Sequence, residues 1–343
     1  MKQDYPLFIS FVQQLVKPHL QKMQNSLANL FSGKSGGMSI TDLSLQLYRK
    51  TIKRFHSAHV ATHWLMTHGA IPFLEKTRNF RTMPDDPFWF RLELLTNRHE
   101  VETIALLDQL AAPGLTMLDI GAHVGYYSHR YAKVLGENGR IFAFEPHPRT
   151  FATLQHNVEH LPQVTAVNLA LAEQEGTAEL HDYLMMSASG SLHYDESMAA
   201  LQKAQTHETD IAPRIAQRFD AQTFTVRTMP VDDFLAAQKV EQVDLVKMDI
   251  EGAEIGALRG MQRTIANSPN LKLVMEYNPQ ALTAFGHNPV AALREVQSFG
   301  FAQVEAIEQD GRLTNLTHQP DHLRALTEQL MQNMGVINLL LQK

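Results

Sequence analysis

The chain has 343 residues, of which 44% are hydrophobic and 19% are charged, an ordinary balance for a globular protein that buries a core. Its formal net charge of −6 provides no basic field for a polyanion, which argues against nucleic acid as the main partner. The chain contains no cysteine, and this excludes disulfides, zinc thiolate sites and thiol nucleophiles.

Residues 1–70 carry apolar side chains at helical spacing, for example Phe8, Phe11 and Leu15, and they predict a helical N-terminal extension. The start of the chain lacks the charged region, apolar run and cleavage site of a signal peptide. No stretch reaches the ~20 apolar residues of a transmembrane helix. We therefore expect a cytoplasmic protein, and the N-terminal helices offer a surface for homo-oligomer formation.

Prolines interrupt the pattern that follows this extension, at Pro72, Pro84 and Pro87. They predict short strands and turns over residues 71–90, before a helix at about residues 100–110. The main domain is therefore expected to span residues 71–343.

From residue 115 onward, short apolar segments alternate with helical segments. The apolar segments read TMLDI, GRIFAFE, VTAVNLA, VDLVKMD and LKLVMEY. Such alternation predicts an α/β fold with a doubly wound, mostly parallel sheet and helices on both faces. Residues 176–230 break the alternation with a polar stretch that is too long for an ordinary connection. We expect this insertion to cover the substrate, with Met185, Met186, His193 and Tyr194 in its wall.

The segment LDIGAHVGYYS, residues 118–128, predicts a ligand-binding turn between a strand and a helix. The strand ends near Asp119, and Gly121 and Gly125 let the backbone turn tightly and approach a ligand. A dinucleotide fingerprint needs a third glycine where this chain has His123. S-adenosylmethionine has no phosphate and tolerates the histidine.

Glu145 ends the next predicted strand, 26 residues after Asp119. A carboxylate at this place can accept hydrogen bonds from both ribose hydroxyls of a nucleotide cofactor. Cofactors based on nicotinamide and S-adenosylmethionine both use such an acid. The residues 100–175 are thus expected to form the cofactor half of the domain.

The segment VDLVKMDIEGAE, residues 243–254, predicts the catalytic edge of the sheet. Asp249 and Glu251 follow a strand directly, and side chains at the carboxyl ends of strands face the ligand crevice of an open α/β sheet. We expect one of these two acids to remove a proton from the acceptor. His123 and Glu276 are the other candidate bases, although His123 is better explained by packing beside the cofactor turn.

A divalent metal is a second use of the same edge. Asp249, Glu276 and Asn278 would supply three oxygen ligands on adjacent strand ends, and such ligands suit magnesium. Acids at strand ends more commonly contact the substrate directly, so a metal site is not the favoured interpretation.

The ordered motifs LDIGAHVGYYS, FAFEPHP, NLAL, VKMDIEGAE and VMEY resemble those of the FkbM family of methyltransferases, over roughly residues 85–310. The resemblance implies a class I methyltransferase fold, Rossmann-like with a seven-stranded sheet. It also implies S-adenosyl-L-methionine as the methyl donor and a hydroxyl acceptor on a small molecule, polyketide, sugar or glycan. The family usually has asparagine where this chain has His123.

The resemblance also assigns residues by position. The methionine part of the cofactor would be framed by the turn residues Asp119, Gly121, Ala122, His123 and Gly125, and Glu145 would hold the ribose. Asn168 and Ala170 would lie near adenine, and Glu102 would reach the methionine amine.

Together these features predict an S-adenosylmethionine-dependent methyltransferase that acts on a hydroxyl. An NAD-dependent oxidoreductase is the main alternative, because Asp119, the glycine turn and Glu145 would serve either cofactor. A binding module that keeps the cofactor pocket but has lost the transfer chemistry is the third.

Overall fold

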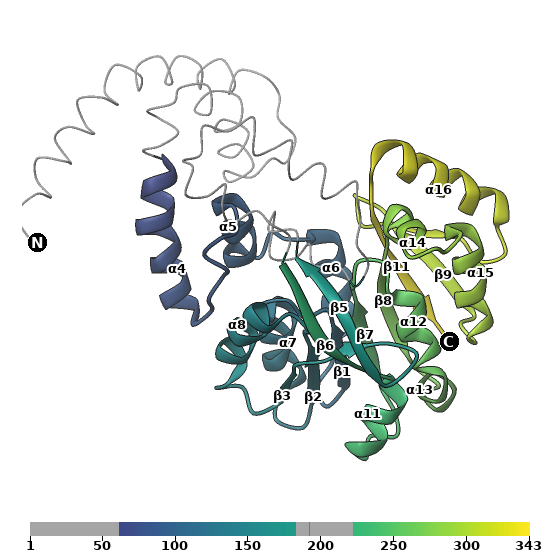
Figure 1. The fold of residues 1–343 in the computed structure, drawn as a ribbon, viewed down its shortest axis with the longest axis horizontal. Helices are drawn as coiled ribbons and strands as arrows, with labels where there is room; N and C mark the ends of the chain where they lie inside the picture. The colour runs from purple at the N-terminus through teal and green to yellow at the C-terminus, as the bar shows by residue number, and fades with distance from the viewer. Residues whose placement is uncertain (1–61, 183–191, 193–221) are drawn as a thin grey trace, which may run out of the picture. The chain divides into compact units, whose positions relative to one another are not determined.

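The structure is a computed structural model that describes residues 62–182, 192 and 222–343 (Figure 1). These residues divide into two compact units, one made of residues 62–78 and 88–95, the other of residues 79–87 and the remainder from 96 onward. The helices expected before residue 62 lie outside the described residues, as do Met185, Met186, His193 and Tyr194. The domain boundary at residue 71 and the association of copies through the N-terminal helices therefore stay predictions.

The first unit is helical. A π-helical turn, η2 (Met66–Ala70), leads directly into α4 (Ile71–Arg78), and α5 (Phe88–Thr96) follows. The prediction of short strands over residues 71–90 was therefore wrong. Pro72 lies at the second position of α4, directly after the π-helical turn, where the regular hydrogen-bond ladder that a proline would break is already altered.

The second unit is built on an eight-stranded sheet in the order β10-β9-β11-β8-β7-β1-β2-β3. Its parallel part consists of β1 (Thr116–Ile120), β2 (Arg140–Phe144), β3 (Val164–Val167), β7 (Leu245–Met248) and β8 (Lys272–Tyr277). The strand β11 (Ile337–Gln342) runs antiparallel between β8 and β9 (Gln303–Ile307), and β10 (Leu313–Asn315) pairs with β9. The predicted mostly parallel sheet is confirmed, with eight strands in place of seven because β10 adds an edge strand.

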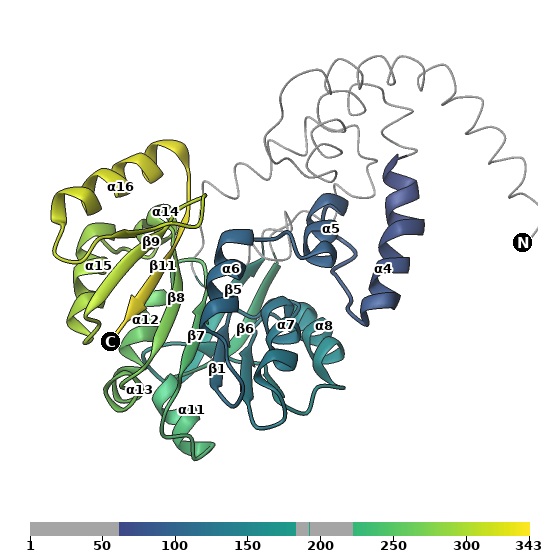
Figure 2. The same ribbon diagram turned by 180° about the vertical axis from the view of Figure 1, so that it is seen from behind.

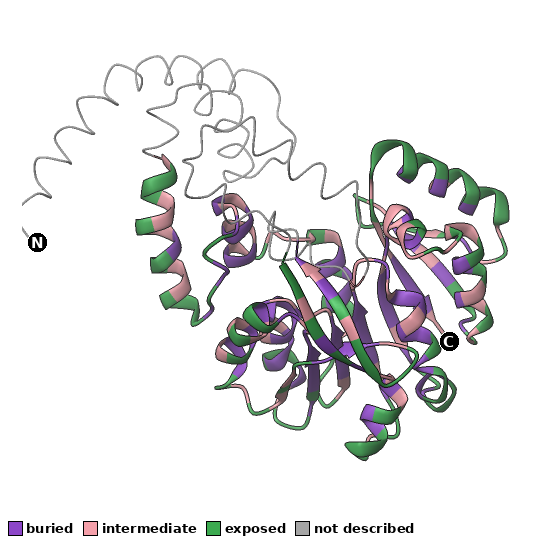
Figure 3. Cartoon of the chain, in the orientation of Figure 1, coloured by how far each residue is buried: buried purple, intermediate pink, exposed green. Residues whose placement is uncertain are grey.

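Helices cover both faces of this sheet (Figures 1 and 2). On one face lie α6 (Val101–Leu110), α7 (Tyr126–Leu135) and α8 (Pro148–Val158). The main apolar core lies on the other face, beneath α11 (Val231–Ala237), α12 (Glu254–Arg259), α13 (Gln262–Asn267), α14 (Pro279–Ala284), α15 (Pro289–Ser298) and α16 (Pro320–Asn333). Side chains of a strand alternate between faces, so Val246 and Met248 enter this core while Lys247 points toward α6 and α7. Figure 3 shows the central strands as the most buried part of the unit.

A second, three-stranded sheet follows β3. It contains β4 (Ala170–Leu171), β5 (Gly176–Asp182) and β6 (Gln222–Met229), with β6 in the middle. The expected polar insertion over residues 176–230 therefore begins and ends with strands, which pair antiparallel from Gly176 with Thr228 to Asp182 with Gln222. Within the part of the chain that the structure describes, no helix has the length and apolar character needed to cross a membrane.

Candidate active site

The turn after β1 lies against the turn after β7. Gly121 has a φ of +80°, and a Cβ added to it would lie 1.8 Å from the backbone oxygen of Asp249. The amide of Asp249 donates to the carbonyl of Ile120 at 2.9 Å, so the two turns are joined through their backbones. Sequence reasoning attributed Gly121 to the approach of a ligand, whereas the structure shows that the neighbouring turn already requires a glycine here.

Asp119 joins β1 to the start of α7. Its Oδ2 accepts hydrogen bonds from the amide of Ser128 at 3.0 Å and from the Ser128 hydroxyl at 2.6 Å. Its Oδ1 is buried and has no hydrogen-bond partner among the described residues. Burial raises the pKa of Asp119 to about 6, against the hydrogen bonds from Ser128.

Glu145 is held by backbone amides on both sides. The amide of His123 donates to Oε2 at 2.9 Å, and the amide of His147 donates to Oε1 at 2.8 Å. Burial raises the pKa of Glu145 to about 7. The bond from His123 depends on a left-handed backbone at that residue, with φ of 51°. Burial also lowers the pKa of His123 to about 3, so this imidazole is neutral and a weak base.

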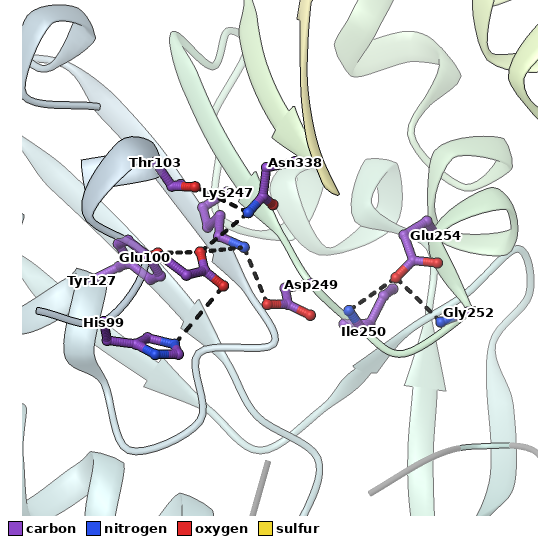
Figure 4. Close-up of polar contacts among 10 residues, drawn as sticks. All are labelled: His99, Glu100, Thr103, Tyr127, Lys247, Asp249, Ile250, Gly252, Glu254 and Asn338. Carbon is purple, nitrogen blue, oxygen red and sulfur yellow. Dashed lines mark hydrogen bonds and ion pairs between the residues drawn. The ribbon is translucent and has the colours of Figure 1, made fainter. Parts of the chain in front are cut away.

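Lys247 forms the centre of a polar network at the carboxyl end of β7 (Figure 4). Its Nζ lies 3.2 Å from Oδ2 of Asp249 and 3.8 Å from Oε2 of Glu100, and it sits 5.4 Å from the ring centroid of Tyr127. Burial lowers the pKa of Lys247, but the carboxylates of Asp249, Glu100 and Glu276 raise it by more than burial lowers it. The net shift is upward, so the ammonium stays charged.

Glu100 connects this network to the last strand of the sheet. Its Oε2 accepts from the Tyr127 hydroxyl at 2.6 Å and from Nδ2 of Asn338 at 3.3 Å. Nδ2 of Asn338 also donates to the hydroxyl of Thr103 at 3.0 Å. Burial favours the neutral carboxyl, but Lys247 and these hydrogen bonds outweigh it and lower the pKa of Glu100.

The carboxylate cluster consists of Asp249, Glu251 and Glu276, whose oxygen atoms lie within 4.8 Å of one another. Burial raises the pKa of Glu251 to about 8, with further contributions from Asp249 and Glu254. Burial and the charges of Asp249 and Glu251 raise the pKa of Glu276 well above its usual range. Such a cluster can share protons or hold a divalent cation through oxygen ligands.

The structure also gives the surroundings of four other predicted residues. Glu102 is in the first turn of α6, and its side chain has no hydrogen bond or ion pair to another residue that the structure describes, whereas Glu100 enters the polar network. Asn168 donates to the carbonyls of Glu145 and Pro146, at 2.8 and 3.0 Å. The side chain of Ala170 packs into the small core of the second sheet. Oδ1 of Asn278 caps α14 by accepting from the amide of Ala281 at 3.1 Å, and its part in a metal site stays a prediction.

Sequence reasoning missed Glu100, Tyr127, Lys247 and Asn338. Lys247 carried a signal, because it is the one charged residue inside the apolar strand LVKM, and a buried charge needs partners. Asn338 carried none, since it meets Glu100 across 238 residues of sequence.

Three buried side-chain oxygens at the carboxyl edge of the sheet lack hydrogen-bond donors within the described ranges. They are Oδ1 of Asp119, Oε2 of Glu276 and Oδ1 of Asn338. The pairing of β11 with β8 places Asn338 directly opposite Glu276, and the pairing of β1 with β7 places Asp119 beside Lys247. S-adenosylmethionine carries an amine, two ribose hydroxyls and an adenine amino group, all of which are donors. The unpaired acceptors therefore fit this cofactor.

Solved structures similar to the chain include a SAM-dependent methyltransferase from Aquifex aeolicus, with a TM-score of 0.37 and 14% identity over 79% of this chain and 97% of that one. Fibrillarin from Aeropyrum pernix, solved with natively bound S-adenosyl-L-methionine, has a TM-score of 0.35 and 12% identity over 62% of this chain and 70% of its own. The strand order of the present fold is observed directly and does not depend on these matches.

Curated relatives include the 2-O-methyltransferase NoeI of Sinorhizobium fredii, which is 25% identical over 56% of this chain and 74% of its own length. Methyltransferase 1 of Beauveria bassiana is 30% identical over 42% of this chain and 57% of its own. The hexuronic acid methyltransferase AglP of Haloferax volcanii is 26% identical over 49% and 59%. The alignments with the latter two thus span less than two thirds of those proteins.

The model of the methyltransferase FkbM domain matches residues 119–310, from the end of β1 to the turn after β9. This match includes Asp119, Glu145, Lys247 and the whole carboxylate cluster, and it spans more than half of the chain. The chain therefore belongs to the FkbM methyltransferase family and is an S-adenosylmethionine-dependent methyltransferase.

Proposed function

We propose that this enzyme transfers a methyl group to a hydroxyl of a sugar or of a glycan. The carboxylate cluster carries the proposal. It places groups that can accept a hydroxyl proton beside the turn after β1, where the cofactor is expected to bind. Two relatives are named for 2-O-methylation and for methylation of a hexuronic acid, which supports an oxygen of a carbohydrate as the acceptor. Family membership disfavours the oxidoreductase alternative.

We infer that the cofactor is bound along the turns after β1 and β2. Glu145 would accept from the ribose hydroxyls, since its two oxygens are already oriented by the amides of His123 and His147 and each oxygen keeps a further lone pair. The unpaired Oδ1 of Asp119 and the turn from Gly121 to Gly125, including Ala122, would contact the methionine part. Contacts of Asn168 and Ala170 with adenine stay predictions. When bound, the cofactor supplies an electrophilic methyl group on a sulfonium.

The two acids of the cluster that follow β7 would then have different roles. Asp249 is paired with Lys247, so its charge is balanced and its carboxylate is fixed in direction, which suits orientation of the acceptor hydroxyl. Glu251 has a pKa raised to about 8 and is the stronger base once ionised. We therefore assign proton removal to Glu251 and acceptor orientation to Asp249. Holding the acceptor in line with the methyl group can contribute roughly 7–11 kcal/mol of barrier lowering, more than the base alone.

The charge of this edge also bears on the acceptor. Among the described groups, Lys247 is the cation that lowers the pKa values of Glu251 and Glu276, and Asp249 and Glu100 already balance it. One ammonium faces two carboxylates, so an anionic acceptor would meet the negative charge that Lys247 leaves unbalanced, and a second one when Glu251 ionises. We therefore propose that the acceptor is a neutral sugar hydroxyl rather than a uronate.

The test is methyl incorporation from labelled S-adenosylmethionine into a panel of neutral sugars, glycosides and the matching uronic acids. Transfer to a neutral sugar that is lost in Glu251→Gln and lowered in Asp249→Asn is the expected result. Transfer to amines alone would refute O-methylation, and preference for the uronate would refute the charge argument. A chelator added to the same assay distinguishes the direct mechanism, which is unaffected, from one in which the cluster binds a divalent cation.

A further inference from the structure

His147 has both ring nitrogens engaged at a buried place between the two sheets. It is the N-cap residue of α8, and its Nδ1 accepts from the amides of Arg149 at 3.2 Å and of Thr150 at 3.4 Å. Its Nε2 lies 3.1 Å from Oδ2 of Asp182, the last residue of β5. His147 and Asp182 are 5% and 6% exposed, so water does not compete strongly for this contact.

These contacts fix the tautomer of His147. Because Nδ1 accepts from two backbone amides, the proton of the neutral ring must reside on Nε2, from which it is donated to Asp182. The ring also packs edge-on against Phe224 of β6, with centroids 4.6 Å apart. The second sheet therefore holds the imidazole through a hydrogen bond from β5 and a ring contact from β6.

The backbone of the same residue holds Glu145. The amide of His147 donates to Oε1 of Glu145 at 2.8 Å, and that carboxylate is the group assigned above to the cofactor ribose. Movement of His147 would change the direction of this amide and leave Glu145 with the single bond from His123. His147 thus links Asp182, at the end of β5, to Glu145 after β2.

We propose that Asp182 and His147 act as a positioning pair, through which the second sheet orients the Glu145 carboxylate for the ribose of the cofactor. This inference rests on the proposed role of Glu145. It predicts that a residue at the end of β5, outside the cofactor turns, sets cofactor affinity.

The experiment measures the dissociation constant of S-adenosylhomocysteine by calorimetry for His147→Asn and Asp182→Ala. Asparagine at position 147 keeps an acceptor for the cap of α8, but its side chain is too short to place its amide donor where Nε2 of His147 meets Asp182. Each variant is expected to bind S-adenosylhomocysteine roughly tenfold more weakly. This is the cost of losing one charge-assisted hydrogen bond between a ribose hydroxyl and a Glu145 carboxylate that is no longer correctly oriented. The double variant should be no weaker than either single one, because both remove the same bond. Asp182→Asn keeps an acceptor for Nε2 and should restore most of the affinity.

A purely structural role would give a different pattern. The 2′-deoxy analogue of S-adenosylhomocysteine lacks one ribose hydroxyl, so the variants should weaken its binding by a smaller factor than that of the parent compound. Equal losses for both compounds, or unchanged affinity in both single variants, would overturn the positioning pair. Glu145→Gln is measured in parallel: if it binds both compounds as the parent enzyme does, the proposed ribose site itself is wrong.

Discussion

Replacement of Glu251 by glutamine should abolish the rise of kcat/KM with pH that the parent enzyme is expected to show below about pH 8. Burial, Asp249 and Glu254 raise the pKa of Glu251 to about 8. If Glu251 is the base, only about a tenth of the enzyme holds it ionised at pH 7, so kcat/KM of the parent should rise about tenfold per pH unit up to about pH 8. Glu251→Gln should lose this rise and lower the plateau by roughly 10²–10⁴-fold.

The assay is initial-rate transfer from S-adenosylmethionine to the best neutral sugar, over about pH 6 to 9.5 with ionic strength held constant. Glu175→Gln is the matched control, because Glu175 is an exposed glutamate outside the site and its loss should leave the profile unchanged. Asp249→Asn should lower the plateau and keep an acidic limb, but this limb should lie at lower pH because the charge of Asp249 no longer raises the pKa of Glu251. A limb near pH 8 that persists in Glu251→Gln would show that another group removes the proton.

Three further changes test the framework of the site. Lys247→Met leaves Asp249 and Glu100 without their shared cation and should cost about 3 kcal/mol in the free energy of urea unfolding; a cost below about 1 kcal/mol would show that water replaces the ammonium. Gly121→Ala should cost about 3 kcal/mol or more, because its φ is +80° and its Cβ meets the Asp249 carbonyl, whereas Gly114→Ala, at φ +85° with open space around it, should cost only about 1 kcal/mol. Burial raises the pKa of Glu254 from 4.5 to about 7, so the folded state keeps a proton that the unfolded state releases, and stability falls as pH rises from about 4.5 through 7. Glu254→Gln should therefore gain up to about 3 kcal/mol over the parent at pH 8 and nothing at pH 4, and equal stability at both values would contradict this sign.

Local sequence predicted the features whose cause is local. Asp119 lies in β1, and Glu145 and Asp249 directly follow β2 and β7. These strands are short apolar runs ended by turn residues, and each was predicted at its observed place. The carboxylate cluster followed from a general property of parallel sheets, whose strand ends meet at one edge. Neither inference needed knowledge of which distant segments come together.

The rest could not be predicted because it depends on packing between distant segments. Glu100 and Glu102 are equally plausible acids before β1, and only the left-handed backbone at Glu100 turns its side chain toward Lys247. The antiparallel pairing of β5 with β6 joins segments on either side of a long polar stretch that showed no periodicity. Pro72 indicated a break in structure, yet the chain accommodates it within a run of helix.

The place of β11 has a consequence for how this protein is made. The strands β9 and β10 are synthesised before β11, but β9 reaches the sheet only through β11, which lies between β9 and β8. Until residues 337–342 leave the ribosome, β8 therefore has an open edge, and Glu100 lacks its partner Asn338. Pairing over such separations is slow and leaves apolar edges exposed during folding. We expect nascent chains that stop before β11 to bind chaperones and to lack methyl transfer, even though every residue of the cofactor turns is already present.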